Sequence, residues 1–475
     1  MLSNNGTGAP AQALAASPSR ADNTTKVGFV YLMPLVLFVV APQLTLRMPL
    51  SWQLQEVDEY ALANAASAAA QAASGYDYTI TLLRGPAYLL ALYLFLRHAD
   101  TGFKILFQSL PYALLLGLAL ASALWSHYPE KVIINFGHMV GMMLVSIAAV
   151  RYFNARLSAL YTWLALLNSP ALLVSAAVCL TLPGLSIGFD GRWIGVLGNA
   201  NSLAVAALCE IWLAMTVLQT SSHPKARLVR WALLPLSWLT LIGTGSKTSL
   251  LAALLLSGLI FTFAPLQNAS TSKRVVRLAA ILGLALLLVL WVLVLKPELL
   301  SYAGFLHALG RSTNLTGRTE LWAVALELIN QRPWFGWSFD SNLSVLKALH
   351  HVTSAAGQFH SGYLDLLVRS GVAGAFLTLA LMAQVSLAAW RFRKTDYRAA
   401  VCYLALIAAV LLHNIAEASL ARDTHPIWML ILLLYFDLIY RRVVQSSTTD
   451  TASHRTIPRQ LEPSHRRPTR SHRHP

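Results

Sequence analysis

Residues 311–374 read RSTNLTGRTELWAVALELINQRPWFGWSFDSNLSVLKALHHVTSAAGQFHSGYLDLLVRSGVAG and lie between two very apolar parts of the chain. The flanking runs 277–296 and 362–390 are each long enough to cross a bilayer, which takes about 20 apolar residues. Between them, arginines, carboxylates, histidines and tryptophans occur together. Polar chemistry is costly inside a membrane, so a membrane protein builds a site most easily on such an excursion. The stretch therefore predicts a functional loop between two membrane helices.

The composition extends this interpretation to the whole chain. Of 475 residues, 56% are hydrophobic and only 12% are charged, whereas charged residues make up about a quarter of ordinary soluble domains. The formal charge of +16 does not indicate nucleic acid, because basic residues stand in short clusters between apolar runs and no nucleic-acid-binding motif occurs. The three cysteines lie in apolar segments without CxxC spacing, which argues against a disulfide framework or a thiolate metal site. We expect an all-α polytopic membrane protein.

Twelve apolar runs predict about 12 transmembrane helices, with one long loop between the ninth and the tenth. They lie near residues 28–46, 84–97, 105–125, 131–150, 157–181, 199–219, 228–243, 248–266, 277–296, 362–390, 399–418 and 426–440. The run 84–97 is short for a span unless the residues before it contribute.

The chain divides into a membrane domain and two tails. Residues 1–26 predict a disordered tail, residues 27–440 the membrane domain with its long loop at 297–361, and residues 441–475 a basic disordered tail. If the N-terminus is cytoplasmic, Lys and Arg concentrate in the loops on the cytoplasmic side, as the positive-inside rule requires. We therefore expect both tails in the cytoplasm and the long loop on the outer face.

Residues 188–204, GFDGRWIGVLGNANSLA, predict a glycine-rich loop that leads into a helix. Asn199, Asn201 and Ser202 can cap that helix, whose positive end suits an anion such as a phosphate when Arg192 is added. A capped helix start with an interfacial arginine explains the same residues equally well.

Residues 320–337 have helical spacing followed by a proline, and Arg318 stands just before them. An arginine fork matches two phosphate oxygens and keeps its charge, as the binding of a lipid pyrophosphate requires. Trp322, Trp334 and Trp337 could stack on sugar rings, although tryptophans more often form a belt at the membrane interface.

His360 stands at the outer end of the tenth span. A neutral imidazole can take a proton from an acceptor hydroxyl, whereas a loop histidine without a function is the simpler interpretation. His350 and His351 raise the question of zinc, but no HxxxH or HExxH spacing supports a metal site.

Ionisable residues inside apolar runs form a second group of candidates. His413 and Glu417 are four residues apart, so we expect them to share a helical face, with Glu417 directed toward the site. Glu210 is expected to be a buried hydrogen-bonding partner. Asp365 and Arg369 are expected to form a structural ion pair.

Together the motifs resemble the O-antigen ligase and polysaccharide polymerase superfamily of bacterial inner membranes, and most closely its exopolysaccharide polymerase branch. His360-Ser361 followed by nine residues and Gly371 fits the pattern H-[N/S/Q]-x9-G, and GRTELW followed by RPWFGW fits the block ahead of it. Three further blocks occur in order: WSHYP at 125–129, RWIGVLGNANSLA at 192–204 and TGSKTSLL at 244–251. In the last block Lys247 stands where arginine is usual, and Ser361 stands where asparagine is commoner.

The resemblance implies an inverting glycosyl transfer that needs neither a metal nor a cofactor, on the periplasmic face of the inner membrane. The donor would be a glycan on undecaprenyl pyrophosphate, and the acceptor another glycan or a lipid-linked acceptor. Other polysaccharide-assembly proteins are possible partners. Arg192 and Arg318 would hold the pyrophosphate and His360 would act as the base. The expected substrate-binding residues are Lys247, Asn201, Trp322 and Glu417.

Two other functions stay open at this point. Within the same superfamily, the chain could be an O-antigen ligase that transfers glycan to the lipid A core. About 12 helices would equally suit a transporter such as a lipid-linked oligosaccharide flippase. Transporters commonly place their sites near the midplane between repeats, whereas no repeat is visible here and the polar residues gather on one outer loop.

Overall fold

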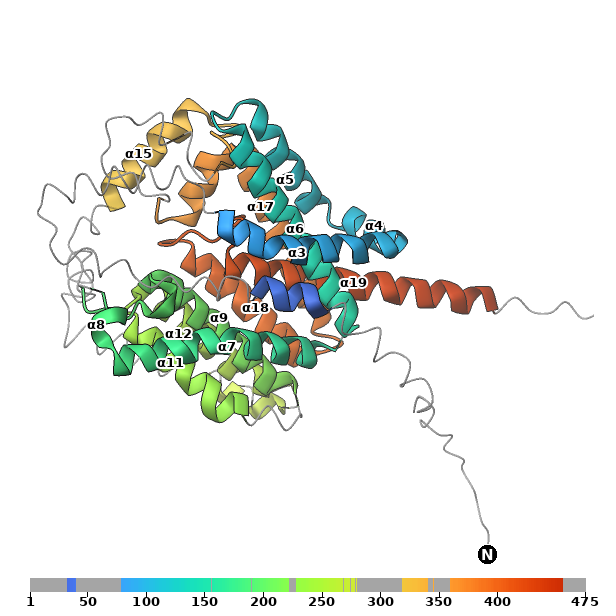
Figure 1. Cartoon of the computed structure of the whole chain (residues 1–475). Coiled ribbons are helices and arrows are strands. Elements are labelled where there is room, and N and C mark those ends of the chain that lie inside the picture. The colour runs from blue at the N-terminus through green and yellow to red at the C-terminus, as the bar shows by residue number, and fades with distance from the viewer. Residues whose placement is uncertain are drawn as a thin grey trace, which may run out of the picture.

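A computed structural model gives the fold of the chain (Figure 1). It describes residues 32–39, 78–154, 156–188, 190–221, 228–267, 269–273, 275–277, 279, 318–340, 345 and 359–455. Within these residues the fold is helical, and β-pairing is limited to an isolated bridge between Ile187 and Trp193.

The helices follow the order of the apolar runs. They are α3 (Tyr78–Arg97), α4 (Ala99–Gln108), α5 (Leu110–Ala121), α6 (Pro129–Phe153), α7 (Leu157–Thr181), α8 (Pro183–Ser186), α9 (Ala200–Thr220), α11 (Leu234–Gly243), α12 (Lys247–Phe263), α15 (Arg318–Gln331), α17 (Gly362–Phe392), α18 (Tyr397–His413) and α19 (Pro426–Arg455). Short tighter or wider turns join some of them: η3 (Ser122–Leu124), η4 (Gly195–Leu197), η5 (Val229–Leu233) and η6 (Ala264–Leu266).

Several of these helices have the length and composition of membrane spans. Among the described residues, five helices can cross a membrane, and a sixth span results if α4 and α5 cross as one bent pair. The predicted all-α polytopic membrane class is therefore confirmed. The count of about 12 spans stays a prediction, because most of the runs 28–46 and 277–296 lies outside the described residues.

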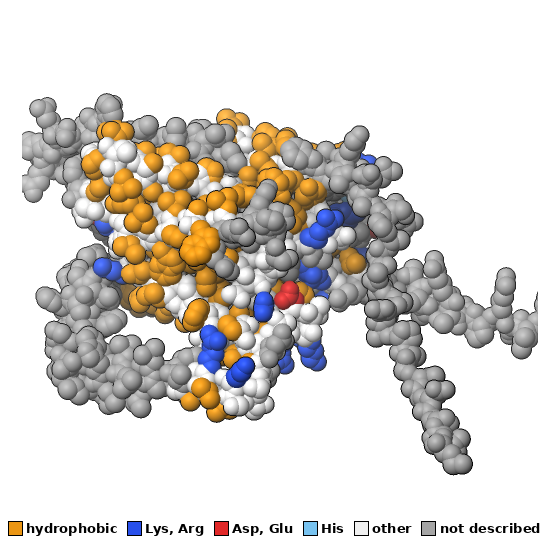
Figure 2. Space-filling model, turned by 90° about the horizontal axis from the view of Figure 1, so that it is seen from below, with side chains coloured by type: hydrophobic (Ala, Val, Ile, Leu, Met, Phe, Trp, Pro, Cys, Tyr) orange, Lys and Arg blue, Asp and Glu red, His pale blue; other side chains and the backbone are white. Residues whose placement is uncertain are grey.

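The apolar outer surface agrees with a lipid environment. Leu82, Phe107 and Phe261 are 73%, 82% and 71% exposed. Figure 2 shows hydrophobic side chains spread over much of one face, with Lys and Arg side chains gathered on another part of it. Water-soluble monomers rarely expose apolar area on this scale, whereas a bilayer solvates it.

The run 105–125, expected as one span, is divided between two helices in the structure. Helices α4 and α5 meet there at an angle of 89°. The break falls at Ser109, whose hydroxyl and amide both donate to the carbonyl of Leu106, at 2.8 and 3.0 Å. Pro111 follows in the first turn of α5, where its missing N–H is tolerated, but it could not continue α4. The neighbouring α3 reaches 20 residues because residues before 84 do contribute to it.

Two further boundaries differ from the sequence prediction. The run 399–418 was expected as one helix, but α18 ends at His413, and Glu417 lies in the loop that follows. Helix α19 continues to Arg455, so the first part of the tail 441–475 is helical rather than disordered. Residues 456–475 and the tail 1–26 lie outside the described residues.

The H-[N/S/Q]-x9-G motif and the RPWFGW block pack against each other at a kink in α17. Gly371 interrupts this helix with a positive φ of 61°, and a Cβ at that position would collide with the backbone of Trp334. Gly336, with a φ of 67°, approaches the backbone of α17 just as closely. The spacing from His360 to Gly371 therefore sets where the RPWFGW block packs relative to His360.

The WSHYP segment and the helix after it form hydrogen bonds with residues 339–340, which follow the RPWFGW block. The hydroxyl of Ser126 donates to Oδ2 of Asp340 at 2.8 Å. The Asn135 amide in α6 donates to the carbonyl of Phe339, also at 2.8 Å. This motif therefore anchors the polypeptide after RPWFGW to the start of α6.

The ends of α6 and α17 meet the middle of α19 on the side opposite the start of α17. The Tyr440 hydroxyl in α19 donates to Oδ1 of Asn154, which ends α6, at 3.2 Å. The Arg441 guanidinium lies 5.1 Å from the ring centroid of Phe392, the last residue of α17. Arg151 lies in the last turn of α6. Basic residues expected on the cytoplasmic side thus gather at one end of the bundle.

Candidate active site

A cavity of about 520 Å³ lies among α7, α9, α19, residues 32–39 and the loops that precede α17 and α19. Asn201, Val205, Cys209 and Leu213 line it at successive turns of α9. Twelve residues at 1.5 Å each correspond to a depth of about 18 Å. The cavity thus extends from a polar end, where α9 begins, into the apolar interior of the bundle.

His360 lies at the polar end of this cavity. Its backbone has a positive φ of 48°, which is uncommon for residues other than glycine, and it directly precedes Ser361, the N-cap of α17. The following amide, of Gly362, donates to the carbonyl of Asn414 at 2.8 Å. The His360 side chain is 25% exposed, and its Nδ1 lies 3.7 Å from Oε2 of Glu417. The tertiary structure therefore holds the imidazole between a helix start and a carboxylate.

Glu417 reaches His360 from the loop after α18. Its amide donates to the carbonyl of His413 at 3.0 Å, which makes one last turn beyond the helix. Its Oε1 accepts a hydrogen bond from Nδ2 of Asn201 at 3.4 Å. The prediction that Glu417 faces the site agrees with this geometry. The prediction that it shares a helical face with His413 is wrong, because the helix ends before Glu417.

Asn201 also connects this pair to Arg192. The Arg192 guanidinium donates from Nη2 to Oδ1 of Asn201 at 2.7 Å and from Nε to the carbonyl of Thr244 at 2.7 Å. Its Nη1 lies 3.7 Å from the Asp190 carboxylate. Lys247, at the start of α12, is exposed three residues after Thr244. The Arg192 loop and the TGSKTSLL block are therefore neighbours.

Helix α15 brings the loop after residue 317 close to His360. The Trp322 indole donates to the carbonyl of Phe359 at 3.1 Å, next to His360 itself. Arg318 is the first residue of α15 and stands one turn before Trp322, but its side chain lies outside the described part of the structure. Trp322 is therefore at the site, and its bond to the backbone favours an anchoring role.

The α9 start is built as predicted. Asn199 is the N-cap, and its side-chain oxygen accepts from the amides of Asn201 and Ser202 at 2.9 and 3.1 Å. Capping by Asn199 leaves the Asn201 side chain available for its contacts with Arg192 and Glu417.

Sequence reasoning missed Arg422, which also lines the cavity. Its Nη2 and Nε donate to the two carboxylate oxygens of Asp365, at 2.8 and 3.2 Å. Arg369 holds the same carboxylate at 3.0 Å, so the predicted ion pair between Asp365 and Arg369 is confirmed but is part of a triad. The signal in the sequence was an arginine in the short polar gap just after Glu417.

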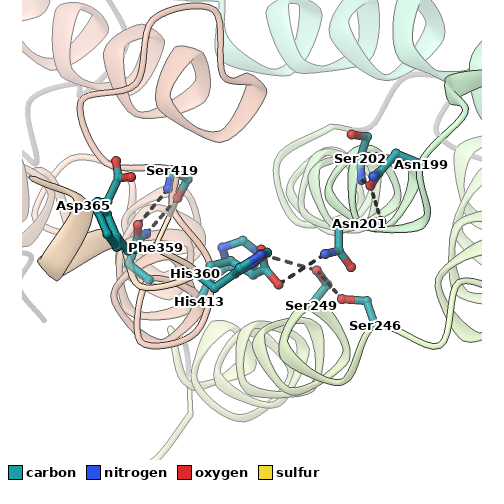
Figure 3. A network of polar contacts seen from close by, with 12 residues as sticks. Asn199, Asn201, Ser202, Ser246, Ser249, Phe359, His360, Asp365, His413 and Ser419 are labelled. Atoms are coloured by element: carbon teal, nitrogen blue, oxygen red, sulfur yellow. Dashed lines mark hydrogen bonds and ion pairs between the residues drawn. The ribbon is translucent and has the colours of Figure 1, made fainter. Parts of the chain in front are cut away.

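Two further polar groups lie along the cavity wall. The Asn168 amide donates to Ala206 O and to Glu210 Oε2, at 3.1 and 2.9 Å, which confirms Glu210 as a buried hydrogen-bonding partner. His413, which also lines the cavity, lies 3.4 Å from the Ser249 hydroxyl (Figure 3).

His425 stands in the loop before α19. Burial lowers the pKa of His425 to about 3, and the neighbouring His413 and Arg422 act in the same direction. His425 therefore stays neutral and is a poor candidate for proton transfer.

Metal coordination has no support in the part of the chain that the structure describes. No group of three or more His, Cys, Asp or Glu side chains is placed there to hold an ion. His350 and His351 lie outside the described residues.

Comparisons with known proteins agree with these motifs. Residues 232–379, from the segment before α11 into α17, match the family model described as O-antigen ligase. This part of the chain is therefore similar to the O-antigen ligase family. The match includes Lys247, Arg318, Trp322 and His360, whereas Arg192, Asn201 and Glu417 lie outside it.

A curated relative extends the likeness. An O-antigen ligase of Pseudomonas aeruginosa is 27% identical over 241 residues, which cover 49% of this chain. The match spans about half of that relative, 52% of its length. The predicted resemblance to the ligase and polymerase superfamily is therefore confirmed, while its exopolysaccharide polymerase branch stays a prediction.

Proposed function

We propose that this protein is an inner-membrane glycosyltransferase that transfers glycan from a lipid pyrophosphate to an acceptor hydroxyl during O-antigen or exopolysaccharide assembly. The observation that carries the proposal is the meeting of His360, Glu417 and Asn201 at one end of a deep cavity, with Arg192 hydrogen-bonded to Asn201. Three separate segments of an otherwise apolar chain supply these residues. Ionisable and hydrogen-bonding groups that converge at a cavity are the usual mark of an active site.

The geometry supports a direct displacement. The acceptor hydroxyl oxygen attacks the anomeric carbon while the bond from that carbon to the pyrophosphate oxygen breaks, and the bonding electron pair leaves with the pyrophosphate. The hydroxyl proton passes to His360, whose Nδ1 faces Glu417 and whose Nε2 is the nitrogen left to act as base. Attack opposite the leaving group inverts the anomeric centre.

Stabilisation of the departing pyrophosphate is the larger contribution to the rate. Arg192 lies beside the positive start of α9 and donates toward Asn201, so a diphosphate bound there would meet both a guanidinium fork and the positive end of the helix. Such preorganised charge lowers the barrier most when the site excludes water. Arg318 and Lys247 would add positive charge from the two other segments near the site.

A transporter remains a weaker proposal. The cavity is deep enough for a lipid-linked substrate, but His360, Glu417 and Asn201 gather at the end where α9 begins rather than near the midplane of the bundle. Catalysis explains why a histidine with a positive φ faces a carboxylate there.

Cell glycans from a deletion strain test the proposal. Loss of long polymer with single repeats retained would assign polymerase activity, and loss of polymer from the lipid A core would assign ligase activity. Complementation with the wild-type gene should restore the glycan, whereas the His360→Ala gene should not. Unchanged glycans after deletion, or accumulation of lipid-linked glycan on the cytoplasmic face only, would contradict the transferase proposal.

A further inference from the structure

The contacts around Asn201 form a relay of polar groups from the Arg192 loop toward His360. Arg192 donates to Asn201 Oδ1 at 2.7 Å, Asn201 donates to Glu417 Oε1 at 3.4 Å, and Glu417 Oε2 lies 3.7 Å from His360 Nδ1. The four residues belong to three segments, and Asn201 and Glu417 are 216 positions apart. A change in the contacts of Arg192 can therefore alter the contacts of His360 through the side chains of Asn201 and Glu417.

The orientation of the Asn201 amide follows from its neighbours. A guanidinium can only donate hydrogen bonds, so the atom of Asn201 that faces Arg192 must be its carbonyl oxygen. The amide nitrogen then points to the Glu417 carboxylate, which can only accept while ionised. The positive charge on one side polarises the amide and strengthens its bond to the carboxylate on the other side.

The last link of the relay is incomplete. A distance of 3.7 Å allows charge attraction but exceeds a hydrogen bond, and Nδ1 of His360 is buried without a hydrogen-bond partner among the described residues. Arg422 and His413 also face Glu417 and act on it electrostatically. Glu417 therefore interacts with Asn201, Arg422 and His413 as well as with His360, and its contact with His360 is too long for a hydrogen bond.

We propose that Asn201 is a positioning residue that makes the basicity of His360 depend on the lipid pyrophosphate. A diphosphate that takes the Arg192 guanidinium away from Asn201 removes the charge that polarises the amide. The bond from Asn201 to Glu417 weakens, and the carboxylate closes on Nδ1 of His360. That contact fixes the N–H on Nδ1, leaves Nε2 as the base and raises its proton affinity. The inference rests on the proposed function, since it takes a lipid diphosphate as the ligand of Arg192.

Titration of His360 by NMR tests this coupling without any transfer assay. The full-length protein in detergent carries ¹⁵N-labelled histidine, the His360→Gln spectrum identifies the signal, and farnesyl diphosphate serves as the probe. The wild-type midpoint of His360 should rise by about 1 pH unit when the probe saturates, because a carboxylate brought within hydrogen-bond distance favours the imidazolium.

Two substitutions separate the relay from a direct effect of the probe's own charge. In Glu417→Gln the rise should disappear. In Asn201→Leu the midpoint should already be high without the probe and change little when it is added, because Glu417 is no longer held back. The helix cap belongs to Asn199, so this substitution leaves the start of α9 intact. Ser202→Ala, one residue further along the same cavity wall, is the matched control and should keep the wild-type rise.

The outcomes that overturn the inference are distinct from those that overturn the function. An equal rise in wild type, Glu417→Gln and Asn201→Leu would mean that the probe acts directly on His360 and that the relay has no role. Saturable binding without any rise in the wild type would also overturn the relay alone. Absence of probe binding, followed by tryptophan fluorescence, would overturn the relay together with the proposed lipid pyrophosphate ligand.

Discussion

At the cavity end of the bundle, His360, Asn201 and Glu417 surround an open space, whereas at the opposite end Tyr161, Tyr403 and Asp437 pack against one another. The Tyr161 hydroxyl donates to the Tyr403 hydroxyl at 2.8 Å, both rings are fully buried, and Tyr403 is in turn hydrogen-bonded to Asp437. At the cavity end, the contacts of Glu417 with Asn201 and His360 are longer, at 3.4 and 3.7 Å.

The difference separates two uses of polar residues in an apolar protein. Fully buried groups that satisfy one another away from a cavity stabilise the packing of helices and leave nothing to offer a ligand. Groups held by several partners at longer distance around a cavity can exchange those partners for a substrate. The comparison therefore predicts that substitutions at the two ends affect different measurable properties.

The largest expected effect is on reporter activity, which depends on the end of the helical bundle that faces out of the cytoplasm. A reporter that is active only outside the cytoplasm should be active when fused after Lys347 and silent when fused after Lys394, because the basic residues gather at the end away from the cavity. The reverse pair of results would place the cavity on the cytoplasmic side and would remove the proposed site from its substrates.

Replacing His360 should have the next largest effect. His360→Ala should lower glycan transfer by about 10²–10⁴-fold, the usual contribution of a general base, while the amount of protein in the membrane stays unchanged. Transfer is measured in membranes with a lipid-linked donor, and protein by immunoblot. His350→Ala is the control and should transfer normally. Equal damage from both substitutions would contradict a single base.

The arginines should contribute somewhat less. Arg192→Ala and Arg318→Ala should each lose about 10²–10³-fold in rate, which corresponds to on the order of 2–4 kcal/mol of transition-state stabilisation. The lysine variants keep the charge but lose the fork, so they should also be impaired. Full activity of both variants at Arg318, with normal protein levels, would identify that residue as an interfacial anchor only.

At the opposite end, Tyr403→Phe should affect stability and spare transfer. The substitution removes the hydroxyl between Tyr161 and Asp437 and should cost roughly 0.5–2 kcal/mol, seen as a lower unfolding temperature in detergent. Tyr93→Phe, on the exposed face of α3, is the matched control without an effect. A loss of transfer per folded molecule in Tyr403→Phe would show that the two ends are not separate in function.

The smallest expected effect is that of a chelator. EDTA added to wild-type membranes should leave transfer unchanged, because the proposed mechanism uses histidine and arginine side chains and assigns no step to an ion. Inactivation that is reversed by adding back a divalent cation would reopen the zinc alternative at His350 and His351.

The sequence by itself determined the membrane class, the order of the apolar helices and the kinds of residue at the site. Hydropathy is a local property that adds up along the chain, so runs such as 131–150 and 199–219 predict α6 and α9 closely. The capping role of Asn199 and the ion pair of Asp365 with Arg369 were also predictable, because both depend on residues within four positions of each other.

Only the tertiary structure decided which of these residues meet. The contact between Asn201 and Glu417 joins residues 216 positions apart, and the end of α18 at His413 turns Glu417 away from the helical face that its spacing suggested. Arg422 is likewise held at the site by a long-range contact, its hydrogen bond to the carboxylate of Asp365, 57 positions earlier. Such contacts follow from how whole helices pack and where their loops return, and no local pattern of residues specifies that.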